Sequence, residues 1–137
     1  GLTRFIAICL LTGYVWLGIS GLSAMWFGGV PVGPQYDATL HAFFLGFVFA
    51  MIFAHAPIIF PAVLGARMTY RPLFYAHVTL LQVTLLARVI GDVSGWGAGR
   101  QVGGLLNAVT LLLFLVTTVS ALKSPMERTT TAQAGRS

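Results

Sequence analysis

The chain has 137 residues, of which 57% are hydrophobic and 8% charged, and its mean hydropathy is +0.87. A soluble domain of this length could not bury so much apolar surface, so the composition excludes an ordinary water-soluble protein and indicates an integral membrane protein. The formal charge of +5 does not predict nucleic-acid binding, because the cations flank apolar segments, where membrane topology places them. The lone Cys9 supports no internal disulfide.

The apolar segments predict an all-α fold, an antiparallel four-helix transmembrane bundle. The bundle is expected to occupy residues 1–123 as one domain, with a polar, disordered tail at 124–137. Glycine- and proline-rich linkers should separate the helices, with Asp37 capping the second helix and Pro72 in the first turn of the third. The four helices are expected at about 2–27, 37–64, 72–91 and 102–122.

The second predicted helix organises the chain. On an ideal helix, His41 and His55 lie about 21 Å apart along the axis and within about 40° of each other around it. An ionisable group inside a membrane predicts a function, so we expect both histidines to face the bundle or a pocket within it.

A ridge of small residues lies beside these histidines. Such ridges let helices approach closely in lipid, so we expect neighbouring helices and other membrane subunits to pack here. The ridge consists of Ala38, Ala42, Gly46, Ala50 and Ala54, which recur at every fourth position.

The third predicted helix carries a polar stripe on an otherwise apolar surface, formed by His77, Thr84, Arg88 and Asp92. Arg88 and Asp92 are four residues apart and are expected to pair. In the fourth helix, Asn107 is expected to form a hydrogen bond to another helix.

Three histidines in apolar helices suggest a metal cofactor, because neutral imidazole binds haem iron and the magnesium of chlorophyll. His55 and His77 are the candidate axial ligands, although their depths differ by roughly 7 Å. His41 is a further candidate, and Arg88 is suited to hold a haem propionate if Asp92 does not neutralise it. The alternative is that each histidine bonds a carbonyl or hydroxyl group across the bundle.

Two segments carry a family resemblance. DATLHAFFLGFVFAMIFAHAPIIFPAVLG and YRPLFYAHVTLLQVTLLARVIGD resemble part of the NnrS-like family of haem- and copper-containing membrane proteins, over about residues 37–92. The resemblance rests on His41, His55, His77 and Arg88. It implies a haem-related role in respiration or nitrogen-oxide metabolism. The chain has fewer helices and histidines than a full set of redox sites requires, so neither copper nor catalysis is expected.

The leading interpretation is therefore a non-catalytic subunit of an electron-transfer assembly in the bacterial cytoplasmic membrane. It would bind haem b through His55, His77 or His41. The first alternative is a cofactor-free accessory subunit packed on a larger redox or photosynthetic complex. The second is a subunit that binds a chlorophyll-type pigment.

The distribution of cations predicts that both termini are cytoplasmic. Reporter fusions after Ser137 and within residues 28–36 should report the cytoplasm and the opposite side, respectively, by the positive-inside rule. A C-terminal fusion on the outer side would contradict this topology. The cations expected on the cytoplasmic side are Arg4, Arg67, Arg71, Lys123, Arg128 and Arg136, against Arg100 and the boundary residue Arg88.

Overall fold

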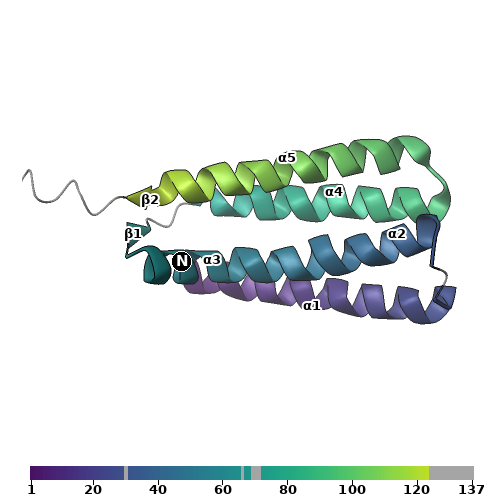
Figure 1. The fold of residues 1–137 in the computed structure, drawn as a ribbon, viewed down its shortest axis with the longest axis horizontal. Coiled ribbons are helices and arrows are strands. Elements are labelled where there is room, and N and C mark those ends of the chain that lie inside the picture. The colour runs from purple at the N-terminus through teal and green to yellow at the C-terminus, as the bar shows by residue number, and fades with distance from the viewer. Residues whose placement is uncertain (30, 66, 69–71, 124–137) are drawn as a thin grey trace, which may run out of the picture.

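The chain is almost entirely helical in a computed structural model that describes residues 1–29, 31–65, 67–68 and 72–123 (Figure 1). Two-residue strands, β1 (Arg67–Met68) and β2 (Leu122–Lys123), pair antiparallel near the end that holds the N-terminus. The helices are α1 (Leu2–Phe27), α2 (Pro34–His41), the π-helix η1 (Ala42–Val48), α3 (Phe49–Leu64), α4 (Phe74–Ser94) and α5 (Gly97–Ala121).

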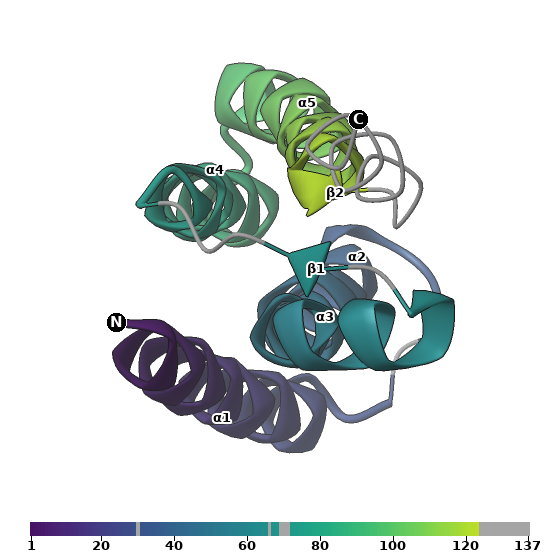
Figure 2. The same cartoon turned by 90° about the vertical axis from the view of Figure 1, so that its left-hand side faces the viewer.

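Since α2, η1 and α3 follow one another without a break, they form one continuous span. The described residues thus contain four helical spans, which lie side by side (Figure 1). Each span is long and apolar enough to cross a membrane, which confirms the expected all-α fold and is compatible with a multi-pass membrane protein. Seen end-on, α1 packs on the α2–η1–α3 span, and α5 packs along α4 (Figure 2). Aromatic rings of Phe5, Phe53, Phe74 and Phe114 fill the core between the spans.

The helix boundaries differ from the expected ones at three connections. Pro72 lies in the turn before α4, which begins at Phe74, and not in the first turn of the helix. The second span begins at Pro34, so Asp37 lies in the first turn rather than at the cap.

The glycine-rich linker after α4 is shorter than expected, because α5 begins at Gly97 rather than at about residue 102. Only Gly95 in this turn has positive φ, at 72°, a conformation that glycine adopts without a Cβ penalty. The predicted disordered tail, 124–137, lies outside the described residues.

The seven-residue π-helix η1 changes which way the second span faces. A π turn closes i→i+5 bonds and so accommodates one more residue than an α turn, which is about 100° of rotation. His41 and His55 are therefore roughly 140° apart around the axis rather than the expected 40°. The expectation that both histidines share one face of the helix is therefore wrong. The composition of residues 42–48 did not predict the π turn.

The same π turn keeps the small-residue ridge on the bundle side. In an uninterrupted α-helix, four steps of four residues would rotate the ridge by about 160°, carrying one end away from the core. All five ridge residues are instead buried, from Ala38 to Ala54. The ridge packs inside the chain, with Gly46 against Trp16 and Ala50 beside Gly13 of α1. Its predicted use by other subunits is therefore wrong, whereas its use by a neighbouring helix is confirmed.

Gly46 offers a direct test of this packing. A Cβ added at Gly46 would lie closer than 3.0 Å to three Trp16 atoms. We expect Gly46→Leu to destabilise the fold by about 1–3 kcal/mol, the usual cost of overpacking, as measured by thermal unfolding in detergent. Gly18→Leu on α1 is the matched control, since nothing lies within 4 Å of a Cβ there. Equal melting temperatures for both variants would refute the contact.

Candidate functional site

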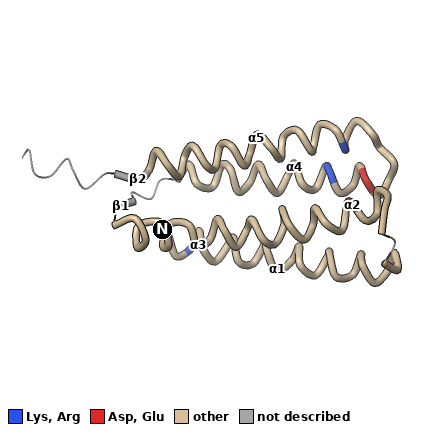
Figure 3. The backbone as a smooth tube through the Cα atoms, viewed as in Figure 1, with Lys and Arg blue, Asp and Glu red and all other residues tan. Residues whose placement is uncertain are grey.

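Charged residues of both signs lie near the end of the bundle where α4 turns into α5 (Figure 3). Five residues from three helices meet here: Asp37 and His41 from α2, Arg88 and Asp92 from α4, and Arg100 from α5. We call these five residues the ion cluster. Two of them, Arg88 and Asp92, belong to the stripe identified in the sequence, and their predicted pairing is confirmed.

Arg88 lies at the centre of the ion cluster. Its Nη2 donates to Asp37 Oδ2 at 2.6 Å, and its Nε donates to Asp92 Oδ2 at 3.2 Å. Its Nη1 donates to the backbone oxygen of Arg100 at 3.1 Å. Each guanidinium nitrogen thus has an acceptor, so a haem propionate would have to compete with these three bonds for Arg88.

Asp92 is the buried member of the cluster, with a fully inaccessible side chain. Arg100 Nε lies 3.1 Å from Asp92 Oδ1, an ion pair without hydrogen-bond alignment, and Arg100 Nη2 lies 3.5 Å from Asp37 Oδ2. Two carboxylates therefore face two guanidinium groups. This balance matters because an unpaired buried charge is costly.

Glycines make room for the large guanidinium group between α4 and α5. A Cβ on Gly103 would lie within 3.0 Å of the Arg88 backbone, and one on Gly104 would collide with Arg88 Nη1. A Cβ on Gly91 would meet the backbone of Gly99 and Arg100 at 2.6–3.0 Å. The close approach of the two helices thus depends on missing side chains at this end.

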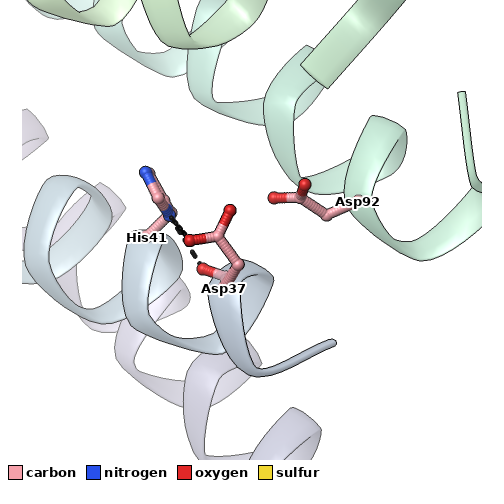
Figure 4. Close-up of side chains that lie close together, drawn as sticks. All are labelled: Asp37, His41 and Asp92. Atoms are coloured by element: carbon pink, nitrogen blue, oxygen red, sulfur yellow. Dashed lines mark hydrogen bonds and ion pairs between the residues drawn. The ribbon is translucent and has the colours of Figure 1, made fainter. Parts of the chain in front are cut away.

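His41 completes the cluster but is oriented away from its centre (Figure 4). Its Nδ1 lies 2.8 Å from Asp37 O, and because a carbonyl only accepts, Nδ1 donates. The other ring nitrogen points away from both carboxylates. Asp37, His41 and Asp92 do bring ligand atoms within 4.8 Å of one another, the spacing of a cation site. The guanidinium groups of Arg88 and Arg100 already supply the positive charge there, so the group is better described as an ion-pair network.

His55 is exposed on the outer surface of α3, about 14 Å from the end of the helix. The expectation that it faces the bundle interior is wrong, because the π turn rotates it outwards. Its Nδ1 donates to Met51 O at 2.7 Å, which leaves the lone pair on Nε2. No described residue forms a hydrogen bond to Nε2, so this nitrogen is left as a free acceptor on an exposed side chain.

His77 has the opposite environment, with a fully buried ring. The rings of Phe53, Phe74 and Phe114 surround it, with centroids 5.0, 5.6 and 5.3 Å away. Neither of its ring nitrogens has a hydrogen-bond partner among the described residues. A tetrapyrrole would reach these nitrogens only if one of the three phenylalanine rings moved.

The three histidines therefore do not converge on one site. Phe53 contacts His77 and lies two residues before His55, about 200° away around the helix, so the His55 side chain points away from His77.

The expected interhelical hydrogen bond of Asn107 is present, since Thr84 Oγ1 donates to Asn107 Oδ1 at 2.6 Å.

Sequence reasoning missed two interactions: the hydrogen bond that Trp16 Nε1 donates to Gln82 Oε1, and the ion pair of Asp37 with Arg88. One signal pointed to Asp37. The chain has three acidic residues, and a carboxylate beside so much apolar sequence needs a cationic partner.

The ion cluster predicts a ranking of stability. Arg88→Met removes the central cation and leaves the buried Asp92 with Arg100 alone, so we expect a loss of about 3 kcal/mol. Arg100→Met should cost less than about 1 kcal/mol, because the Arg100 side chain is 44% exposed. Chemical unfolding of both variants in the same detergent measures the difference. Equal losses would contradict the central position of Arg88.

Comparison with known proteins gives a family. No curated protein matches the chain, and no solved structure matches it. Residues 1–123 match a family model described as "Domain of unknown function (DUF8744)". The match spans the ion cluster and all three histidines. The chain therefore belongs to the DUF8744 family.

Proposed function

We propose that the chain is a multi-pass protein of the bacterial cytoplasmic membrane with both termini in the cytoplasm. Large apolar side chains on the outer surface support insertion, including Leu11 at 68%, Leu105 at 67% and Val63 at 75% exposure. Such a surface is unfavourable in water and suited to acyl chains. The ion cluster lies at one end of the helices, where charged groups are best tolerated (Figure 3).

Within this membrane setting, we propose that the protein is a haem-b-associated subunit of an electron-transfer assembly and is not itself catalytic. The observation that carries the proposal is the outward-facing His55. A neutral imidazole whose Nδ1–H is bonded to a carbonyl has the tautomer that metal-binding histidines use, with Nε2 free to bind. At this depth in a bilayer, water is not available to satisfy that lone pair.

The surroundings of His55 fit a haem group. Ile52 and Ile59 lie one turn before and after it and are 39% and 49% exposed, so they offer apolar surface to a macrocycle. When bound, haem supplies a one-electron redox centre. The residues of this chain would hold its iron from one side and exclude water from that face.

The other candidates fit less well. His77 is enclosed by aromatic rings, and His41 belongs to the ion cluster about 21 Å away along the span. Arg88 already donates from each of its three nitrogens. His55 is thus the ligand we favour, and the resemblance to the NnrS-like family is the basis for a respiratory or nitrogen-oxide-related role.

A cofactor-free accessory subunit is the second candidate. The same free Nε2 of His55 can accept a hydrogen bond from a donor on a neighbouring membrane protein. A pigment-binding subunit, with His55 on chlorophyll magnesium, is a third. Absorption spectra separate the three, because reduced haem gives a sharp α-band, a chlorophyll-type pigment absorbs in the far red, and an accessory subunit does neither.

We expect His55→Ala to abolish the haem spectrum of the purified protein, and His55→Met to retain part of it, because a thioether also ligates haem iron. His77→Phe is the matched control and should retain the full spectrum, since it keeps an aromatic ring among those of Phe53, Phe74 and Phe114. A wild-type protein without a haem band would refute the haem proposal. A haem band that survives His55→Ala but not His77→Phe would assign the ligand to His77.

A further inference from the structure

We propose that the interface between α4 and α5 conducts protons across the membrane, with His77 as the group that carries the proton through the apolar core. This activity goes beyond the proposed haem function and does not depend on it. It rests on a row of buried polar side chains that the haem proposal does not use.

Buried side-chain atoms without a hydrogen-bond partner are confined to two helices. Within the described part of the chain, every such atom belongs to α4 or α5. An unsatisfied polar group is costly in the hydrocarbon of a bilayer, and water is the smallest molecule that both donates to and accepts from groups of this kind. The atoms are Nδ1 and Nε2 of His77, Nε2 of Gln82, Oδ1 of Asp92, Nδ2 of Asn107 and Oγ1 of Thr118.

Contacts at two levels fix how α4 and α5 run past each other. Thr84 is hydrogen-bonded to Asn107, and the ring of His77 lies 5.3 Å from that of Phe114. On each helix, the two levels are seven residues apart, which is about 10.5 Å. The heights of residues on the two helices can therefore be compared directly.

Buried polar side chains follow one another along this interface. On α5, Asn107, Thr110 and Thr118 are buried and lie within about 80° of one another around the axis. His77 lies between Thr110 and Thr118 in height, and Asp92 ends the row in the ion cluster. From Asp92 to Thr118 the row is about 28 Å long, close to the thickness of the hydrocarbon core of a bilayer, roughly 30 Å.

Single water molecules fit the steps between neighbours in this row. Arg88 and Thr84 divide the stretch from Asp92 to Asn107, so successive members differ in height by about 4.5–6 Å. A water molecule that bonds to two groups spans about 5.6 Å, which is two hydrogen bonds of about 2.8 Å. Water held in this way passes a proton on by exchanging its donor and acceptor roles.

His77 differs from the other two histidines because both of its ring nitrogens are free to exchange protons. In His41 and His55, Nδ1 is bonded to the carbonyl oxygen four residues earlier, which fixes the tautomer. Neither nitrogen of His77 bonds to a described residue. The neutral ring takes a proton on one nitrogen and releases the other proton from the second nitrogen. It leaves the step neutral, as the opposite tautomer, and rotation about the Cβ–Cγ bond restores the first arrangement.

The aromatic rings around His77 suit a proton in transit. The centroids of Phe53, Phe74 and Phe114 lie 5.0, 5.6 and 5.3 Å from that of the imidazole. These distances are within the range of about 6 Å over which an aromatic ring attracts a cation. The same rings interrupt a continuous column of water, so a proton crosses by way of the imidazole, whereas larger ions are excluded.

The ion cluster gives the row an entrance without net positive charge. Its two carboxylates balance its two guanidinium groups, so charge repulsion does not exclude a proton. Asp37 is 28% exposed, whereas the side chain of Asp92 is fully buried. Oxygens of the two carboxylates lie within 4.8 Å of each other, a gap that one water molecule bridges. A proton taken up by Asp37 at the surface therefore reaches Asp92 inside.

Proton flux into vesicles tests the activity. Wild-type protein is reconstituted into vesicles that contain potassium and the pH dye pyranine, and valinomycin imposes an inside-negative potential. The vesicles should acidify faster than protein-free vesicles. We expect His77→Phe to lower the rate to that of protein-free vesicles, because phenylalanine cannot accept a proton. Thr118→Val should also lower the rate, because it removes a hydroxyl group from the row.

Thr117→Val is the matched control for Thr118→Val and should conduct like the wild type. The Thr117 hydroxyl is already bonded within its own helix, to Leu113 O and Phe114 O. Wild-type vesicles that acidify no faster than protein-free ones would overturn the proposal. It would also be overturned if His77→Phe and Thr118→Val conducted like the wild type.

Thermal unfolding in detergent separates conduction from a structural role. Replacing a hydroxyl group that has no partner leaves no new unsatisfied atom, so Thr118→Val should melt at or above the wild-type temperature. A much lower melting temperature would show that the hydroxyl group stabilises the fold, and would remove Thr118 from the row.

Nuclear magnetic resonance of protein labelled with 15N-histidine tests the relay directly. His77 should show both neutral tautomers in exchange. His41 and His55 should each show one tautomer, with the proton on Nδ1, because that nitrogen donates to a carbonyl oxygen. A single fixed tautomer at His77 would overturn its role as the proton carrier.

Discussion

The fold depends on one electrostatic constraint, which is that charges beside an apolar interior must be neutralised locally. Two carboxylates and two guanidinium groups meet in the ion cluster, and Arg88 joins α2, α4 and the backbone of α5 through three donated bonds. The glycines that bring α5 close to α4 are needed for this geometry. Electrostatics and close packing are therefore coupled at this end of the molecule, because a bulkier residue at Gly103 or Gly104 would displace the central cation.

At the opposite end, the interior is mostly apolar and aromatic, and the buried polar side chains there include His77 and Thr118. The His77 ring makes T-shaped contacts with the rings of Phe53 and Phe74. Such contacts do not use the ring nitrogens as hydrogen-bonding groups, and neither nitrogen has a partner among the described residues. Ionisable groups therefore have different surroundings at the two ends: ion pairs at one end, and the aromatic rings around His77 at the other.

Composition and periodicity were sufficient to predict the four apolar helices and the Arg88–Asp92 pair, whereas the burial of all five ridge residues depends on the π turn. The direction of His55 was not predictable, since it depends on a single π turn. Such a turn alters rotation by about one residue and leaves hydrophobicity unchanged. Asp37 was also out of reach of local rules, because its partner Arg88 is 51 residues away. Helical arithmetic is reliable within an α-helix and fails where bonding switches to i→i+5.

The π-helix η1 also affects how related sequences should be aligned. A homologue with one residue fewer between positions 42 and 48 would continue as an α-helix through this region. Thirteen residues rather than fourteen would then separate the positions of His41 and His55, which again places them about 140° apart around the axis. Every side chain beyond the gap would keep the face that it has here, and a histidine aligned with His55 would still face outwards. A homologue of equal length that lacked the π turn would instead turn all later side chains by about 100°, so a change of exposed face can occur here without any gap in the alignment.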